Sequence, residues 1–428
     1  MNPKLLATIG AVLGATALGA TVAAAQGLSI RTMAGSAASG TNNGYGSNAR
    51  FAHPLALACD GSGNVFVADT ENCTIRKIDS LGYASTFAGL AGSPGTNDGP
   101  AASARFYAPQ GVALDGAGNL YVADTGNSTI RKITIAGVVS TLAGAPGEAN
   151  RYDGPGAAAR FNHPEGLTIG PDGNLYVADA WNHTVRKVTP SGDASTVAGW
   201  AGHYGCGDGT NSKARFNRPA AVAVDDLGNL YVADCFNHTI RRITADGTVT
   251  TLAGLPGVWG STDASNSLAR FYLPQGICLT SSGDLLVADS GNQALRRLSL
   301  VGTNWAVTTV AGLSGLAGTL NGTGSGARFF FPGGIASDSG DYLYIADLGN
   351  NQVRTTRVVP PVLRSTRLPT ALVLDWPTSA EGFGLYQSAA LGPTASWSLV
   401  STGIVTNGDN LFHTNTLTGS NYYRLRYP

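Results

Sequence analysis

The tripeptide Val-Ala-Asp recurs along the chain at an almost constant interval. Five copies and one Ile-Ala-Asp variant end at Asp69, Asp124, Asp179, Asp234, Asp289 and Asp347, so the intervals are 55, 55, 55, 55 and 58 residues. A fixed period of this length is typical of a chain built from one supersecondary unit used repeatedly. The repeat constrains the fold more than the activity, because most recurring residues are those that the fold itself needs.

Each unit contains four short apolar segments separated by Gly, Asp or Asn. In the copy at residues 105–144 they surround Val112, Tyr121, Ile130 and Leu142. Short runs rich in Val, Ile, Leu, Tyr and Thr between turn residues predict strands. The second segment does not alternate apolar with polar residues, which indicates burial on both faces. Four-stranded sheets stacked around an axis meet this requirement, so we predict an all-β β-propeller.

The link between the first two strands is Asp-x-x-Gly-Asn or a close variant. It predicts a tight hairpin in which glycine takes a positive φ. The glycines expected there are Gly63, Gly118, Gly173, Gly228, Gly283 and Gly340.

The two ends of the repeat predict how the ring closes. The Thr-x-Ala-Gly strand that ends five units has a sixth copy at residues 31–35, before the first Val-Ala-Asp. The last unit stops after Arg354 and meets Pro360 and Pro361 instead of a fourth strand. We therefore expect the N-terminal strand to complete blade six, which removes an exposed edge. The prediction is a closed six-bladed propeller at residues 28–358.

Polar residues recur with the same period. The Asp of each Val-Ala-Asp is followed by Asn three positions later and Arg seven positions later. Members of these two sets are Asn72, Asn127, Asn182, Asn237, Asn292 and Asn350, then Arg76, Arg131, Arg186, Arg241, Arg296 and Arg354. Asn side chains can satisfy backbone N–H groups of a turn. An exposed ion pair contributes only about 0–1 kcal/mol, so we expect this set to fix loop geometry while the apolar strands hold the ring. Six equivalent copies do not make one asymmetric active site, and we predict no catalytic residue among them.

The repeated string Phe-x-x-Pro-x-Gly-[IV]-Ala … Gly-Asn-Leu-Tyr-Val-Ala-Asp-x-x-Asn-His-x-[IV]-Arg resembles the NHL repeat family over roughly residues 28–358. The resemblance implies a six-bladed propeller that serves mainly as a scaffold for binding proteins, peptides or other polymers. A minority of family members are enzymes, including a metal-dependent lyase. One departure is that blade six carries three extra residues.

Positions that break the symmetry are the better candidates for function. Two positions after the Val-Ala-Asp aspartate, aromatic residues occur only in blades three and four, as Trp181 and Phe236. The loops that enter blades three, four and five add further candidates: Arg151, Tyr152, Trp200, His203, Tyr204 and Trp259. We expect the loops between strands two and three and the blade-to-blade loops to share one face. An aromatic, lightly charged patch there suits stacking on sugar rings or gripping a peptide. The alternative is that these rings only cover loop cores.

Cysteines and histidines raise two further questions. Cys206 and Cys235 both belong to loops of blade four on the expected face, so we predict a disulfide between them. His53, His163, His183 and His238 invite a metal site, but they are spread over blades one, three and four. Catalytic zinc needs three protein ligands at one point, so we expect no metal. No cofactor motif is present either, and we expect no cofactor.

Composition and the first residues indicate the compartment. Lys4, an apolar Ala- and Gly-rich stretch and residues 23–25 (Ala-Ala-Ala) predict a signal peptide at residues 1–25; a membrane anchor is the alternative. We thus expect a secreted, periplasmic or cell-surface protein. Charged residues are 13% and sum to zero, which argues against nucleic acid as a partner. We expect a monomer that binds an extracellular protein, peptide or glycan.

After a linker at residues 359–364 the period ends. The segments around Trp376, Tyr386, Leu399 and Tyr423 predict a small antiparallel β-sandwich at residues 365–428. It resembles fibronectin-III-like modules appended to secreted bacterial proteins. The whole chain favours a non-enzymatic binding propeller, with ligand on the loop face of blades three to five. The alternative is an extracellular lyase or hydrolase at the channel mouth, which would require several His, Asp or Glu side chains there.

Overall fold

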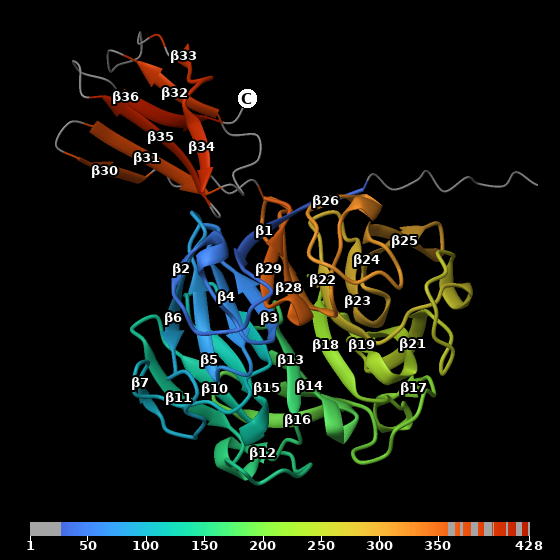
Figure 1. Ribbon diagram of the computed structural model, residues 1–428. Coiled ribbons are helices and arrows are strands. Elements are labelled where there is room, and N and C mark those ends of the chain that lie inside the picture. Colours follow the sequence, from blue (N-terminus) through green and yellow to red (C-terminus); the bar gives the residue numbers. More distant parts are fainter. Residues whose placement is uncertain are drawn as a thin grey trace, which may run out of the picture.

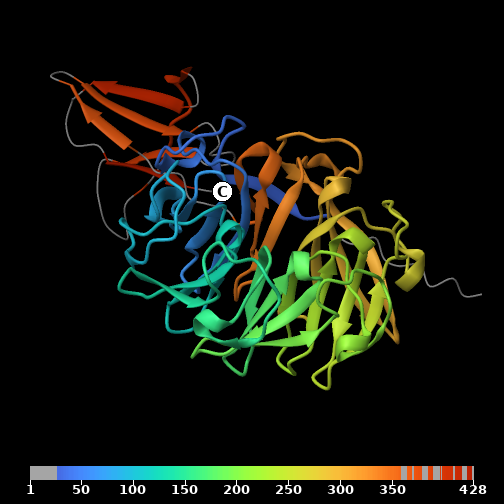
Figure 2. The same cartoon turned by 90° about the horizontal axis from the view of Figure 1, so that it is seen from below.

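The computed structural model describes residues 27–357, 364–368, 371–377, 384–388, 396, 398–407, 410–416 and 422–426. The expected signal peptide and most of the expected linker lie outside these residues. Within residues 27–357 the strands form six antiparallel sheets arranged around one axis (Figure 1, Figure 2). This part of the chain is all-β, as the repeat predicts.

The first three blades have the same strand order from the innermost strand to the outermost. Blade one contains β3 (Pro54–Cys59), β4 (Val65–Asp69), β5 (Thr74–Ile78), β6 (Tyr83–Ala88) and β2 (Gly44–Tyr45). Blade two contains β8 (Gly111–Leu114), β9 (Leu120–Asp124), β10 (Thr129–Ile133), β11 (Val138–Ala143) and β7 (Gly99–Pro100). Blade three contains β13 (Pro164–Ile169), β14 (Leu175–Asp179), β15 (Thr184–Val188), β16 (Asp193–Ala198) and β12 (Gly154–Pro155).

The last three blades also begin with an innermost strand at the axis. Blade four contains β18 (Pro219–Val224), β19 (Leu230–Asp234), β20 (Thr239–Ile243), β21 (Thr248–Ala253) and β17 (Gly209–Thr210). Blade five contains β22 (Pro274–Leu279), β23 (Leu285–Asp289), β24 (Ala294–Val301) and β25 (Asn304–Gly312). Blade six contains β27 (Pro332–Ser337), β28 (Leu343–Asp347), β29 (Gln352–Thr355), β1 (Ser29–Gly35) and β26 (Gly322–Thr323).

The N-terminal strand closes the ring as expected. β1 pairs antiparallel with β29, with Arg31 opposite Thr355 and Gly35 opposite Gln352. Each innermost strand contacts the next, from β3 through β8, β13, β18, β22 and β27 and back to β3. The first and last units are therefore neighbours, and the inner edge strands surround a central channel.

The apolar core lies between the blades. One cluster joins Tyr121 and Ile130 of blade two to Phe161 and Val177 of blade three, and all five residues of the second strand β9 are buried. Burial on both faces of the second strand was the basis of the propeller prediction, and it is confirmed. Burying each such side chain contributes roughly 1.5–3 kcal/mol, and consecutive blades share these contacts.

Three details differ from the sequence prediction. Five of the six sheets carry a fifth, two-residue strand, because the segment that enters each blade pairs with its outer edge. The hairpin of blade six has Asp341, not Gly340, at the positive-φ position, because Asp341 lies six residues before Asp347, as Gly118 does before Asp124, and makes the same hydrogen bond, from its N–H to Asp338 O. The three extra residues lie in blade five, where they lengthen the β24–β25 hairpin.

Short 3₁₀ helices occur at two recurring places. Five follow the second strand: η2 (Thr125–Asn127), η4 (Ala180–Asn182), η6 (Cys235–Asn237), η8 (Ser290–Asn292) and η10 (Leu348–Asn350). The others precede the inner strand: η1 (Gly46–Asn48), η3 (Gly156–Ala158), η5 (Asn211–Lys213), η7 (Asn266–Leu268) and η9 (Gly324–Gly326). None of the helices in the described part of the chain is long and apolar enough to span a bilayer.

The recurring Asp, Asn and Arg form a buried unit in every blade, which we call the clamp. In blade three, Arg186 Nη1 lies 2.8 Å from Asp179 Oδ2, and the Arg186 guanidinium packs over the Phe161 ring at 4.9 Å. Asn182 Nδ2 donates to Asp179 Oδ2 at 2.8 Å and to Asn150 O at 2.7 Å. Asp179 and Arg186 are 0% and 1% exposed.

The clamp corrects two expectations. The ion pair is buried, not exposed, because the segment that enters the blade covers it: Arg186 donates to Tyr152 O and packs on Phe161. Removing one partner would leave an uncompensated buried charge. The Asn side chain donates to a carbonyl of the blade-to-blade loop, while the Asp carboxylate accepts the backbone N–H, at Asn162 in blade three. The set does fix loop geometry, but it does so from inside the protein.

The C-terminal residues form two further antiparallel sheets. The first contains β30 (Arg364–Arg367), β31 (Ala371–Pro377), β35 (Asn410–Thr416) and β34 (Ile404–Asn407). The second contains β33 (Ser398–Leu399), β32 (Gly384–Ser388) and β36 (Tyr422–Arg426). They share a small core of Leu374, Trp376, Leu385 and Val400. The likeness to a fibronectin-III module stays a prediction.

Candidate functional site

One end of the propeller gathers the two kinds of loop that we expected to share a face, together with the segments that precede the inner strands; we call it the loop face. The loops after the second strands hydrogen-bond to the segments before the inner strands, as Trp181 N does to Asn162 O at 3.1 Å. The blade-to-blade loops join them, as Gly202 N does to Asn182 O at 3.0 Å. Residues from both kinds of loop and from these segments therefore lie on the same face.

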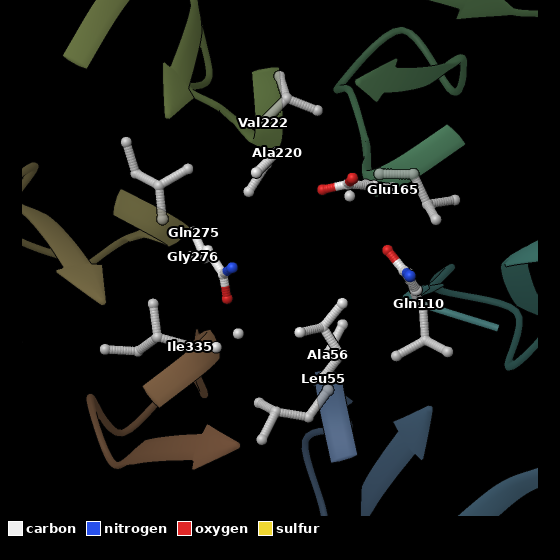
Figure 3. Close-up of a pocket in the computed structure, with 18 residues that line it drawn as sticks. Leu55, Ala56, Gln110, Glu165, Ala220, Val222, Gln275, Gly276 and Ile335 are labelled. Carbon is white, nitrogen blue, oxygen red and sulfur yellow. The ribbon is translucent and has the colours of Figure 1, made fainter. Parts of the chain in front are cut away.

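A pocket opens where the central channel meets the loop face (Figure 3). Its outer ring consists of the residues that follow the proline of each inner strand, which we call the rim positions. These residues are Leu55, Gln110, Glu165, Ala220, Gln275 and Gly333. Figure 3 shows the side chains of Gln110, Glu165 and Gln275 pointing into the opening. Three of six otherwise equivalent positions thus present polar groups to one space.

Beneath the rim lies a ring of aliphatic residues, which we call the floor. It consists of Leu57, Val112, Leu167, Val222, Ile277 and Ile335. The same six residues also line the cavity at the opposite end of the channel. The floor therefore separates the polar rim from the opposite mouth.

Glu165 is the ionisable residue among those that line the pocket. Its side chain is 8% exposed, and its Oε1 lies 3.0 Å from Nε of Arg218 in the next blade. Burial raises the pKa of Glu165, and the Arg218 charge opposes that shift. The rim thus holds a carboxylate whose charge is offset by a neighbouring guanidinium.

Arg218 connects the rim to the aromatic residues around it. Its guanidinium lies 5.5 Å from the Trp181 ring centre and 4.9 Å from that of Phe236. His163 packs against Trp181 at 5.8 Å, and burial and the Arg218 charge lower the pKa of His163. Cation–π contacts of this kind stabilise the arrangement by about 0.5–2 kcal/mol. Trp181, Phe236 and the channel mouth therefore form one continuous surface.

The structure corrects our interpretation of Trp181 and Phe236 as a feature of two blades only. In blades two, five and six the corresponding loop residue is glycine, and a Cβ on Gly126 would lie 2.6 Å from the Tyr107 ring. Tyr272 and Phe330 cover Gly291 and Gly349 in the same way. Blades three and four carry Asn162 and Asn217 where those rings stand. Five blades therefore contribute a ring to what we call the aromatic collar: Tyr107, Trp181, Phe236, Tyr272 and Phe330.

Further exposed rings remain concentrated on the loops that enter blades four and five. Trp200 packs on His203 at 4.1 Å and under the Arg215 guanidinium at 4.3 Å. Tyr204 contacts His183 at 5.9 Å, and Trp259 contacts Tyr272 at 5.0 Å. Trp259 and Tyr204 are 64% and 72% exposed. These loops widen the aromatic surface on one side of the collar.

Arg151 and Tyr152 are less well connected to that surface. Arg151 Nη1 reaches Ala201 O at 3.4 Å, which ties the loop into blade three to the loop into blade four. Tyr152 is exposed, and the interactions found for it are those of its backbone carbonyl with Arg160 N and Arg186 Nη2. Of the predicted site residues, these two contribute least to the aromatic surface.

His183 and His238 have a structural role. His183 Nδ1 accepts the Arg218 N–H at 3.1 Å, and His238 Nδ1 accepts the Leu273 N–H at 3.3 Å. Each histidine thus joins its loop to the next blade, and Asn351 does the same for His53 N at 2.9 Å. Burial lowers the pKa of both imidazoles, which keeps them neutral and able to accept. Among the described residues no three His, Cys, Asp or Glu are placed to hold a metal ion.

The predicted disulfide is not formed. Cys206 and Cys235 are both free, as are the other three cysteines. Cys235 is the first residue of η6 and is 2% exposed, whereas Cys206 is exposed on the loop that enters blade four. The equivalent Thr125 of blade two donates to Pro164 O of blade three, so the side chain at this position is directed between blades. Sharing a face was not enough to bring the two sulfur atoms together.

Sequence reasoning missed the rim residues. We compared the six units at the loop after the second strand and after Ala-Gly, but not at the variable position of Phe-x-x-Pro-x-Gly. The same comparison there gives Leu, Gln, Glu, Ala, Gln and Gly. A carboxylate beside two amides at one repeat position was a visible signal.

Comparison with known proteins supports the repeat assignment. The NHL repeat family model matches residues 106–133, 161–188, 216–243 and 271–298, which belong to blades two to five. NHL repeat-containing protein 2 of Bos taurus is 31% identical over 297 residues, which cover 61% of this chain and 41% of that protein. Teneurin-3 of Mus musculus is 25% identical over 361 residues, which cover 76% of this chain and 13% of that protein. The chain thus spans less than half the length of these relatives.

Solved structures share the fold. A protein of unknown function from Bacteroides thetaiotaomicron superposes with a TM-score of 0.60 at 18% identity, covering 77% of this chain and 76% of that one. A protein of the same organism, described as an auxiliary nutrient binding protein, has a TM-score of 0.58 at 16% identity with the same coverage. At these identities the likeness shows the fold alone.

Proposed function

Because the chain belongs to the NHL repeat family, we propose that it is a secreted, non-catalytic binding propeller whose ligand docks on the loop face. The ligand covers the aromatic collar and the loops that enter blades three to five. Its class is a protein, a peptide or a glycan.

The observation that carries the proposal is the aromatic surface. The side chains of Trp181, Trp200, Tyr204 and Trp259 are each at least 49% exposed. The core between the blades is filled by other apolar residues, so these rings are not needed to build it. Exposed aromatic clusters bordered by polar groups are typical of binding sites. The neighbour described as an auxiliary nutrient binding protein is consistent with such a role on this fold.

The character of the channel mouth favours binding over catalysis. Its described lining has one carboxylate, Glu165, which is paired with Arg218, and no group placed to activate water or hold a metal. General acid–base catalysis needs a titratable group free to exchange a proton with substrate. The lyase or hydrolase alternative therefore has no specific observation in its favour.

The test uses the purified protein on glycan and peptide arrays, followed by calorimetry with each binder found. We expect the double variant Trp200→Ala/Tyr204→Ala to bind at least about tenfold more weakly. Tyr342→Ala is the matched control, because Tyr342 is an exposed ring on the turn between β27 and β28, at the opposite end of the propeller. Equal affinity of wild type and double variant would refute the loop face as the binding site.

Export is tested separately. Expression with residues 1–25 in a bacterial host should yield a periplasmic or extracellular protein whose first residue is at or near Gln26. N-terminal sequencing of the recovered protein measures this. Retention of the intact N-terminus in the membrane fraction would favour the anchor instead.

A further inference from the structure

The rim carries hydrogen-bonding capacity that the protein itself does not use. Gln275 Oε1 is buried and has no hydrogen-bond partner. A buried acceptor without a donor costs about 1–3 kcal/mol, and a water molecule or a ligand hydroxyl at the opening can supply that donor. Gln110 and Glu165 point into the same opening (Figure 3). Together they offer amide donors, amide acceptors and carboxylate oxygens.

The pocket is lined below the rim by backbone and aliphatic side chains. A Cβ on Gly111 would lie 2.1 Å from Glu165 O, and one on Gly276 would lie 2.3 Å from Gly333 O, so adjacent inner strands approach closely just below the rim. The aliphatic floor lies under them. The cavity itself measures about 80 Å³, which is below the range for sites that enclose a whole small molecule. The mouth thus suits the end of a ligand and not a chain passing through.

The charge of the pocket favours a neutral ligand. Glu165 is compensated by Arg218, which is itself held between the rings of Trp181 and Phe236. An anion would meet the Glu165 carboxylate, and a cation would meet a carboxylate already paired with a guanidinium. A neutral polyol brings no charge, and it can hydrogen-bond to the amides of Gln110 and Gln275 without disturbing the Glu165–Arg218 pair.

We propose that the channel mouth is an end pocket for one neutral sugar residue of a glycan, which rests on the proposed function because the glycan chain continues over the aromatic collar. Hydroxyl groups bind Gln110, Glu165 and Gln275, and the apolar C–H face of the ring packs on the floor. Adjoining residues stack on Trp181 and Tyr204, since sugar faces pack well on aromatic rings. A peptide would leave the ring of rim amides only partly paired.

The test measures binding of neutral gluco-, manno-, galacto- and xylo-oligosaccharides by titration calorimetry, with acidic oligogalacturonides and the array peptides in parallel. We expect a neutral oligosaccharide to bind and Gln110→Ala/Gln275→Ala to weaken it by about tenfold or more. Gln275→Glu, which keeps the shape and adds a charge, should also weaken binding. Thr168→Val is the control, because Thr168 lies in blade three at the opposite mouth.

The outcomes separate the two proposals. Loss of oligosaccharide binding in the rim variants, with Thr168→Val as wild type, supports the end pocket. Rim variants that bind like wild type while Trp200→Ala/Tyr204→Ala loses binding would overturn the end pocket and leave the loop face standing. Preference for peptides or acidic sugars would overturn the neutral-sugar assignment. A protein that binds nothing on either array would overturn both.

Discussion

The clamp and the loop face lie a few residues apart in every blade, yet they vary in opposite ways. The clamp has the same aspartate, asparagine, arginine and phenylalanine in all six units, and the Arg–Asp distance varies only from 2.7 to 3.0 Å. At the rim and the collar, blades two and five alone share the same residues, a Gln and a Tyr, and the other four blades all differ. The rim alone changes from Leu55 to Glu165 to Gly333 around the ring.

The difference follows from how many partners each side chain must satisfy. Each charge of a buried ion pair needs its counterion and its hydrogen-bond partners. Replacing one of them leaves a buried charge without compensation. A loop side chain that faces water tolerates replacement, because water satisfies what the protein does not. The repeated scaffold therefore leaves its exposed end free to differ from blade to blade, and a one-of-a-kind site can exist on a six-fold ring.

The largest effect should come from removing the N-terminal strand that closes the propeller. A chain that starts at residue 36 lacks β1, so β29 loses its partner and the buried Ile30, Met33 and Ala34 are removed. We expect loss of cooperative unfolding and aggregation through the exposed edge. Size-exclusion chromatography and thermal denaturation measure this, with a chain that starts at residue 27 as control. A monomer that melts like the control would contradict the closed ring.

The clamp should be the next most sensitive region. Arg186→Met leaves Asp179 buried without its counterion, so we expect about 3–5 kcal/mol less stability. Lys187→Met, one residue along the same strand and partly exposed, is the matched control and should change stability by less than about 0.5 kcal/mol. Urea denaturation gives both values. If Arg186→Met and Lys187→Met lowered the free energy of unfolding by similar amounts, the buried ion pair would not be a special source of stability.

The next prediction concerns the aromatic collar of blade two, where Gly126 and Tyr107 should tolerate substitution only when both are changed. Gly126→Trp places a side chain against the Tyr107 ring and should cost about 1–3 kcal/mol. Adding Tyr107→Asn gives blade two the Asn–Trp pair that blade three already has. The backbone N···O distance between these two positions is 2.8 Å in blade two and 3.1 Å in blade three, so only a small adjustment is needed. We expect most of the loss to be recovered, as measured by a double-mutant cycle in urea. Additive losses would mean that the two collar positions are independent.

The smallest effect should be a pH dependence of the loop face. His183 and His238 have pKa values lowered by burial, so the unfolded chain binds protons more readily than the folded one below about pH 6.5. The two rings should therefore add a loss of stability as the pH drops through this region, by a few tenths of a kcal/mol each because both are partly solvated. The clamp aspartates, whose pKa values burial raises to about 6, add the opposite slope, so the imidazole slope is the difference between wild type and a histidine variant. His183→Asn/His238→Asn, which copies Asn351 of blade six, should remove this slope. A slope unchanged in the variant would assign it to other groups.

Much of the body could be predicted from the repeat. The strand pattern, the closure by residues 31–35 and the shared loop face all follow from local periodicity and from counting units. Burial of the clamp could not be predicted, because a strand residue such as Arg186 carries no local sign that the segment entering its blade will cover it. Blade two has its collar ring at Tyr107, whereas blade three has Asn162 at the equivalent position and its ring at Trp181. This change is visible only when the loops of different blades are superposed.

What the amino-acid sequence alone determined was the number of units, the strands in each and their order around the ring, because hydrophobic spacing and turn residues act over a few positions. What only the tertiary structure decided was which side chains meet: that Glu165 reaches Arg218, that Cys235 is buried and does not pair with Cys206, and that three rim residues converge. These contacts join residues about 30 to 165 positions apart. Their distances depend on how twisted blades pack around an axis, which no local pattern encodes.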